Sequence, residues 1–181
     1  RWLARNRQNT YTFHMLKTVP LDKWVPYYKG IVEEAQSFGL QPGFVVSFAD
    51  QQQNNFKLIR EDRLDGGGKV LADDKQIKLS LDELLKTGVR RFTFQIGTSE
   101  FTKPTDARVM QWMKTAHEHL KAATPAATMH IWIHTTCSLH DDNGGYFYHL
   151  PLNADADIGA WVHTTMFYDL ENPAPVYDCT S

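Results

Sequence analysis

Residues 80–120 read SLDELLKTGVRRFTFQIGTSEFTKPTDARVMQWMKTAHEHL, and this stretch decides the fold that the sequence predicts. Ser80 stands three residues before a glutamate, the spacing of a capping box, so a helix is expected to begin there and to end at Gly88. A strand is expected from Val89 to Ile96. A second helix is expected from about Thr105 to Leu120, because apolar residues recur on one of its faces. The stretch therefore predicts a helix, a strand, a short polar loop and a helix in succession.

The 89–96 strand has two chemically different faces. Its large apolar residues alternate with polar ones: Phe92, Phe94 and Ile96 against Arg91, Thr93 and Gln95. The same alternation recurs at 10–15, 44–48 and 129–134, and a fifth strand is expected at 162–168. Central strands of a doubly wound sheet are apolar on both faces. Strands of a (β/α) TIM barrel instead pack large apolar residues outward against helices, so the pattern predicts an α/β fold of the TIM-barrel type.

Between these strands we expect a helix at 21–38, a long loop insertion at about 50–79 with room for a hairpin, and an extended segment at 146–152. The alternation of strands and helices implies right-handed crossovers and a parallel sheet. A complete eight-stranded barrel takes about 250 residues. Residues 1–181 are therefore expected to form a single partial barrel domain, the first five or so β/α units of a larger one. Because open sheet edges are covered in natural folds, a continuation of the same polypeptide or a partner chain is expected to complete the barrel.

Composition narrows the function. With 42% hydrophobic residues and a net charge of −2, the 181-residue chain can bury one core and carries no basic stripe for nucleic acid. No apolar run approaches the roughly 18 residues of a membrane span. The sequence shows no glycine-rich phosphate loop and no nucleophile elbow, so we expect no cofactor. Cys137 and Cys179 follow the fourth and fifth predicted strands, and a disulfide between them would imply a secreted or periplasmic protein.

Two segments carry a family resemblance. The opening RWLARNRQNTY (residues 1–11) is followed by a helix and by Gly39-Leu40 before a strand, and LLKTGVRRF occupies residues 84–92. Both segments resemble hexosaminidase-like glycoside hydrolase barrels, particularly the β-N-acetylglucosaminidases that act on O-linked sugar. The resemblance implies a carbohydrate substrate and paired-carboxylate hydrolysis. Where those enzymes place two adjacent aspartates after the strand, this chain has Gly97-Thr98-Ser99-Glu100, so either Glu100 is the acid or the mechanism is absent.

Three carboxylates are candidates for catalysis: Glu100, Asp50 and Asp142. Glu100 and Asp50 each follow a predicted strand, and barrel enzymes keep their chemistry at the carboxyl ends of strands. A carboxyl group in an aromatic pocket there can have a raised pKa and act as general acid. Glu100 can equally be a loop carboxylate or a helix cap. For Asp142 and the adjacent Asp141 the favoured interpretation is turn chemistry, because an Asp-Asp-Asn-Gly run is typical of turns.

Aromatic and histidine side chains are the candidates for substrate binding, namely His14, Trp132, His134, His163 and Tyr168. The three histidines are expected near strand ends on the inner face, where neutral imidazoles can hydrogen-bond sugar hydroxyls. They can alternatively converge on a metal ion, or each can be satisfied by backbone. His130 lies about 13 Å from His134 along one strand, too far to share an ion. Two further histidines, His117 and His119, are expected to face solvent from a helix.

Three functions remain open. The leading hypothesis is a carbohydrate-active enzyme, a glycoside hydrolase that uses paired carboxylates. The alternatives are a metal-dependent hydrolase with a histidine-rich site at the strand ends, and a barrel that binds glycans without turning them over.

Overall fold

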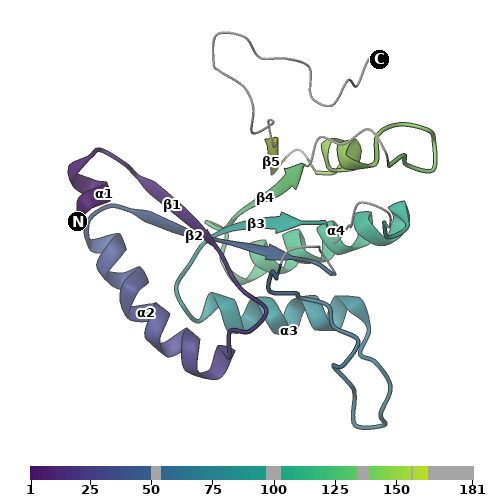
Figure 1. Cartoon of the computed structure of the whole chain (residues 1–181), viewed down its shortest axis with the longest axis horizontal. Helices are drawn as coiled ribbons and strands as arrows, with labels where there is room; N and C mark the ends of the chain where they lie inside the picture. The colour runs from purple at the N-terminus through teal and green to yellow at the C-terminus, as the bar shows by residue number, and fades with distance from the viewer. Residues whose placement is uncertain (50–53, 97–102, 134–138, 156, 163–181) are drawn as a thin grey trace.

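The computed structural model describes residues 1–49, 54–96, 103–133, 139–155 and 157–162. Five parallel strands form one sheet in which each strand lies beside its neighbour in sequence (Figure 1). The strands are β1 (Thr10–His14), β2 (Gln41–Ser47), β3 (Arg91–Gln95), β4 (Thr128–Ile133) and β5 (Ile158–Val162). The helices are α1 (Trp2–Arg5), α2 (Leu21–Ser37), α3 (Asp73–Leu85), α4 (Asp106–Ala123) and the 3-10 helix η1 (Phe147–Asn153). The predicted parallel α/β sheet is confirmed.

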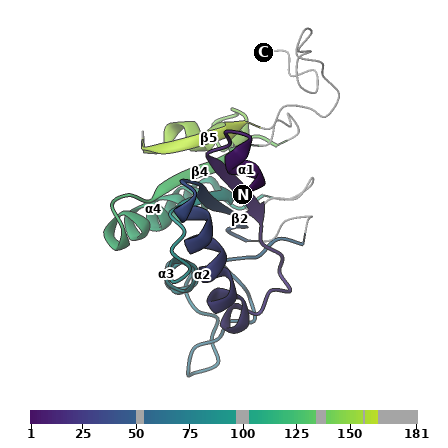
Figure 2. The same ribbon diagram turned by 90° about the vertical axis from the view of Figure 1, so that its left-hand side faces the viewer.

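One face of the sheet packs against α2, α3 and α4, which lie on the same side of it (Figure 1, Figure 2). Phe44 of β2 and Phe92 and Phe94 of β3 are fully buried on this face. Burying such a side chain stabilises the fold by about 1.5–3 kcal/mol. Phe48, just after β2, stacks on Phe94 with ring centroids 4.8 Å apart, and Trp112 of α4 lies 5.8 Å from Phe48. The predicted outward face of large apolar residues is confirmed, which leaves the opposite face for smaller and polar side chains.

The helix that precedes β3 begins earlier than predicted. It begins at Asp73, and Ser80 lies buried in its interior, where its hydroxyl donates to the Leu58 carbonyl at 3.1 Å. The capping-box interpretation of Ser80 is therefore wrong, because the hydroxyl serves a contact from a distant loop. Gly88 has a φ of +84°, the left-handed conformation that was expected to terminate this helix.

The last described strand also lies elsewhere. β5 pairs with β4 from Ile158, whereas a strand at 162–168 was expected, and residues 163–168 lie outside the described ranges. The segment expected to be extended at 146–152 forms η1 instead. Gly159 explains the shift: an added Cβ there would come 2.5 Å from Cδ2 of His130, so the close approach of β5 to β4 requires a glycine that weakens the strand pattern.

The insertion after β2 contains more regular structure than predicted. Its described part runs from Asn54 to Ala72, since α3 takes the remainder. Phe56 donates to the carbonyl of Met15 and accepts from the backbone of Ser47, so this segment adds a short extended piece between the ends of β1 and β2. The predicted hairpin is present, with Leu64 and Val70 paired antiparallel and a loop that projects beyond α3 (Figure 1).

α2 turns Val25, Tyr28, Val32 and Ala35 toward the sheet, with Trp24 packed beside them, and leaves Ile31 exposed. One prediction about a helix face is wrong. His117 was expected in solvent, but it is buried, and its Nδ1 lies 3.4 Å from Oδ2 of Asp155, just before β5. Across the described ranges, no helix is long and apolar enough to cross a membrane.

Candidate functional site

The inner face of the sheet is organised in rows set by the strand register. The row nearest the carboxyl ends joins Ser47, Gln95, Trp132 and Trp161 from β2 to β5. The row beneath it joins His14, Val45, Thr93, His130 and Gly159 from all five strands. No strand residue on this described face is aspartate or glutamate. The rows therefore offer aromatic rings, imidazoles, two hydroxyls and an amide at the end of the sheet where barrels bind ligands.

His14 and Trp132 meet across this face. Their ring centroids lie 5.2 Å apart with an interplanar angle of 60°, although β1 and β4 are separated by two strands. Such contact requires the sheet to curve, so the inner face is concave. His130 and Trp161 form a second pair across the same two rows, with centroids 5.5 Å apart. Two histidine–tryptophan pairs from different strands thus line the concave face.

The insertion after β2 contributes residues that the sequence patterns missed. Asn55 is 3% exposed and its side-chain amide donates to Oε1 of Gln95. Lys57 pairs in parallel register with Ser47, which places it next to the inner row. The residues 51–55 read QQQNN and show no strand periodicity. The only signal that pointed here was the position of this segment directly after a strand end.

The surroundings of His130, in the second row of the inner face, disfavour its protonated form. Burial lowers the pKa of His130, the nearby Arg91 guanidinium lowers it further, and a contact with the Phe92 backbone opposes both. These effects together favour the neutral form of His130. Within the described residues, Nδ1 of His130 and Nε of Arg91 are buried and lack a hydrogen-bond partner. Both groups retain hydrogen-bonding capacity on the concave side.

A cleft of about 730 Å³ opens at the same end of the sheet. It lies among the segments that follow β1 and β2 and the first turns of α4, and its residues include Lys17, Ala49, Phe56, Ile59, Lys103 and Trp112. Lys57 also lines it, so the cleft and the inner face share that residue. Its volume falls in the range of about 300–1,000 Å³ that is usual for ligand sites.

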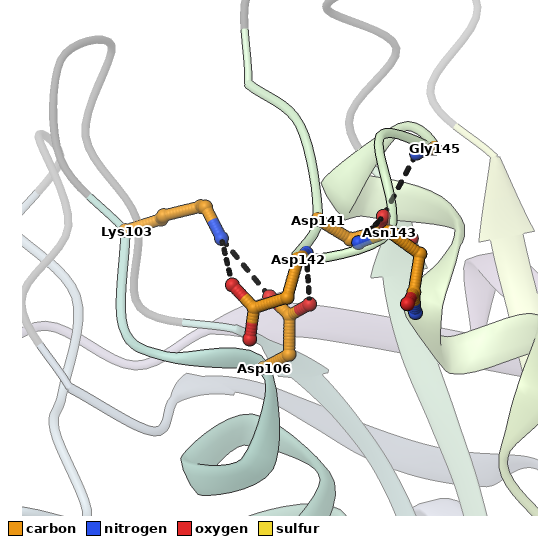
Figure 3. Close-up of polar contacts among 6 residues, drawn as sticks. All are labelled: Lys103, Asp106, Asp141, Asp142, Asn143 and Gly145. Carbon is orange, nitrogen blue, oxygen red and sulfur yellow. Dashed lines mark hydrogen bonds and ion pairs between the residues drawn. The ribbon is translucent and has the colours of Figure 1, made fainter.

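Asp142 belongs to a polar cluster at the start of α4 (Figure 3). Its backbone N–H donates to Oδ2 of Asp106 at 2.5 Å, and Nζ of Lys103 lies 2.9 Å from Oδ1 of Asp106 and 3.9 Å from Oδ1 of Asp142. Burial alone would raise the pKa of Asp106, but the Asp142 backbone and the Lys103 ammonium outweigh it and leave that pKa below its usual value. The Asp142 side chain itself is 70% exposed.

The predicted turn at Asp141 is confirmed. Its carboxylate accepts from the backbone N–H groups of Asn143 and Gly145 at 2.9 and 2.8 Å (Figure 3). Asp142 is thus held beside the start of α4 by its backbone, and its exposed carboxylate lies near Lys103.

The structure places three of the eight candidate site residues. It brings His14 and Trp132 into contact, and it places Asp142 beside Asp106 and Lys103. Five candidates lie outside the described residues: Asp50, Glu100, His134, His163 and Tyr168. Cys137 and Cys179 also lie outside them. Within the described ranges, no three His, Cys, Asp or Glu side chains are grouped closely enough to hold a metal ion.

Comparison with solved structures identifies the architecture. Over 88% of its length the chain superimposes on an O-GlcNAc hydrolase from Thermobaculum terrenum, with a TM-score of 0.55 and 12% identity. It also superimposes on CpGH84B with a TM-score of 0.59 and 16% identity, and on the C-terminal domain of Legionella pneumophila ChiA with 0.56 and 15%, again over 88% of this chain. The fold is that of a β/α barrel. The predicted likeness to O-GlcNAc hydrolase barrels is thereby confirmed at the level of fold.

The chain corresponds to part of such a barrel. It spans 35% of the Thermobaculum enzyme, 28% of CpGH84B and 51% of the ChiA domain. No protein-family model matches the sequence, and no curated protein matches it.

Proposed function

We propose that this chain binds carbohydrate on its concave inner face, as part of a glycoside hydrolase barrel. The observation that carries the proposal is the contact between His14 and Trp132 at the carboxyl ends of β1 and β4. An indole offers an apolar face against which the C–H side of a sugar ring can pack, and an adjacent imidazole can hydrogen-bond a ring hydroxyl. Such a combination suits a ligand that is apolar on its faces and polar around its edge.

The amides beside this pair support the same ligand. Gln95 lies next to Trp132 in the register, and Asn55 bonds to Gln95. Amide groups both donate and accept hydrogen bonds, as hydroxyls do, so the pair suits a neutral, hydroxyl-rich ligand. The location supports it too, because barrel enzymes bind their substrates at the carboxyl ends of the strands.

For hydrolysis we assign Glu100 as the general acid and Asp50 as the second carboxylate. Asp50 follows β2 and Glu100 follows β3 in sequence, so they come from neighbouring strands of the sheet. Glycosidases use two carboxyl groups about 5–10 Å apart, one of which protonates the leaving oxygen. The names of the structural neighbours and the sequence resemblance support this chemistry. Asp142 is the third candidate for a catalytic carboxylate.

Binding and turnover test the proposal separately. Trp132→Ala and His14→Ala are expected to weaken oligosaccharide binding about tenfold each, equivalent to about 1.4 kcal/mol. Tyr27→Ala is the matched control, because Tyr27 is an aromatic residue on α2 that is 71% exposed on the outer side. Glu100→Gln and Asp50→Asn are expected to abolish release of sugar while binding persists. Equal binding by Trp132→Ala and Tyr27→Ala would overturn the proposed site.

A second function has a specific observation in its favour. The described inner face carries no carboxylate on its strands, and the sequence after β3 reads Gly-Thr-Ser-Glu where the resembling enzymes have two aspartates. A barrel that binds glycans without hydrolysing them fits this composition. Two results would favour this alternative. Oligosaccharide binding would depend on Trp132 without any release of sugar, and Glu100→Gln would leave that binding unchanged.

A further inference from the structure

Among the described residues that line the cleft at the carboxyl end of the sheet, basic side chains outnumber acidic ones. Five are basic, Lys17, Lys57, Arg60, Lys103 and Arg108, and two are acidic, Glu61 and Asp62. The whole chain has a net charge of −2. The excess of cations among the described lining residues therefore does not follow from overall composition.

The basic side chains that line the cleft differ in whether they form ion pairs. Arg60 pairs with Asp62 at 2.5 Å, and Arg108 and Lys103 pair with Asp73 and Asp106, two carboxylates that are not among the lining residues. These pairs fix side chains around the cleft. Lys17 is different, because its exposed ammonium forms no ion pair with any residue of the described ranges.

The floor of the cleft is apolar. Phe56, Ile59 and Trp112 are buried residues that line it, and Ala49 adds a small side chain after β2. A cleft with an apolar floor and cationic walls suits a ligand with hydrophobic faces and negative groups at its edge. A sugar ring that bears a carboxylate has both features.

The cleft is connected to the proposed sugar site. Lys57 lines the cleft and is paired with Ser47, whose row on the inner face continues through Gln95 to Trp132. An extended ligand can therefore contact the inner face and the cleft at once. This connection makes one continuous glycan chain a simpler occupant than two separate ligands.

We propose that the glycan bound by this chain is acidic, and that its carboxylate lies in the cleft against Lys17. This inference rests on the proposed carbohydrate binding and adds the class of the ligand. Lys17 would act as a specificity residue, because a single exposed ammonium discriminates charged from uncharged sugars mainly through electrostatics that salt screens.

The test compares ligands that differ only in charge. Oligogalacturonate and its methyl ester, and a hyaluronan oligosaccharide and its carboxyl-reduced form, are titrated against the protein at 50 and 300 mM salt. We expect the acidic member of at least one pair to bind about tenfold more tightly at low salt, and the preference to shrink about threefold or more at high salt. Lys17→Glu should remove the preference, and Lys17→Gln should reduce it.

Lys78→Glu is the matched control. Lys78 is an exposed lysine of α3 that lines none of the described clefts, and its reversal changes the net charge by the same amount. Equal losses in Lys17→Glu and Lys78→Glu would show a general charge effect and overturn the inference. If Lys17→Glu does not fold, the preference for the acidic ligand is measured in Lys17→Gln and, as a function of salt, in the unchanged protein.

The remaining outcomes separate the two proposals. If the uncharged sugars bind as tightly as the acidic ones and Trp132→Ala still weakens them, the acidic preference is wrong and carbohydrate binding stands. If no member of either pair binds, both proposals fail. If single-stranded DNA binds more tightly than every acidic sugar, the cleft takes polyanions of another class and the inference is overturned.

Discussion

Asp73 is the most informative residue for the stability of the helix layer beneath the cleft. It is the first residue of α3, and its carboxylate accepts hydrogen bonds from Nε1 of Trp112 at 2.7 Å and from the Arg108 guanidinium at 2.7 and 3.1 Å. Trp112 is 2% exposed, whereas the Arg108 side chain is 55% exposed. One carboxylate thus ties α3 to α4 through one buried donor and one solvated donor.

The magnitudes follow from that difference. Asp73→Ala leaves the buried indole N–H of Trp112 without its acceptor, which costs about 1–3 kcal/mol. The exposed pair with Arg108 adds at most about 1 kcal/mol, and the lost charge in the first turn of α3 adds about 0.3–1 kcal/mol. We therefore expect Asp73→Ala to lower the free energy of unfolding by about 2–4 kcal/mol, and Asp73→Asn, which keeps an acceptor for Trp112, by less.

The assay is urea unfolding followed by tryptophan fluorescence. Asp74→Ala is the control, because Asp74 lies in the same first turn of α3 but is exposed, so it shares only the helix-charge contribution. We expect the Asp73 variant to lose about 2 kcal/mol more than the Asp74 variant. Equal losses would refute the reasoning, because they would show that the bond to Trp112 contributes nothing beyond helix charge.

The same contact predicts a pH dependence. Burial alone would raise the pKa of Asp73, but the hydrogen bonds from Arg108 and Trp112 outweigh it, so the pKa lies below its ordinary value of 3.8. Its contribution to stability is therefore fully present above pH 3.8 and is lost as the pH falls through the lower folded-state value. The stability difference between the unchanged protein and Asp73→Ala should shrink over that acid range and stay constant from pH 5 to 7.

Three further predictions use the same unfolding measurement. Gly159→Ala should lower the free energy of unfolding by about 1–3 kcal/mol, because the new Cβ would come 2.5 Å from Cδ2 of His130. Gly30→Ala on α2 should raise it by about 0.5–1 kcal/mol, because its Cβ would meet nothing within 4 Å. A loss at Gly30 as large as at Gly159 would contradict this. Gly88→Ala should lower the free energy of unfolding by about 1–2 kcal/mol, since a φ of +84° strains any residue with a Cβ. An unchanged urea midpoint would contradict this and show that the loop relaxes without strain. Because the pKa of His130 is lowered from its ordinary 6.5, the unfolded chain binds its proton more tightly, so stability should fall as the pH drops below 6.5, and His130→Asn should lessen that fall.

The alternation of residues predicted the two faces of the sheet, because successive side chains of a strand point to opposite sides. Phe92 and Phe94 point one way and Thr93 and Gln95 the other whatever surrounds them, so the two faces follow from the order of residues. The candidate binding residues His14 and Trp132 both fall on the inner face by the same parity, although the contact between their rings was not predicted.

Features that depend on distant contacts were not predictable from local patterns. Ser80 shows capping spacing, but its hydroxyl bonds to Leu58, 22 residues earlier. Asn55 reaches Gln95 across 40 residues, and no periodicity in its own segment signals that contact. The start of β5 was missed because Gly159 is required by packing against His130, and strand propensity alone disfavours glycine there.

The most direct test of carbohydrate binding on the inner face is a crystal structure of the protein with a bound oligosaccharide. We predict a sugar ring packed against the Trp132 indole, within hydrogen-bond distance of His14, at the carboxyl ends of β1 and β4. A sugar bound on the outer surface of α2, α3 or α4, with the His14 and Trp132 rings in contact only with each other and with solvent, would contradict it.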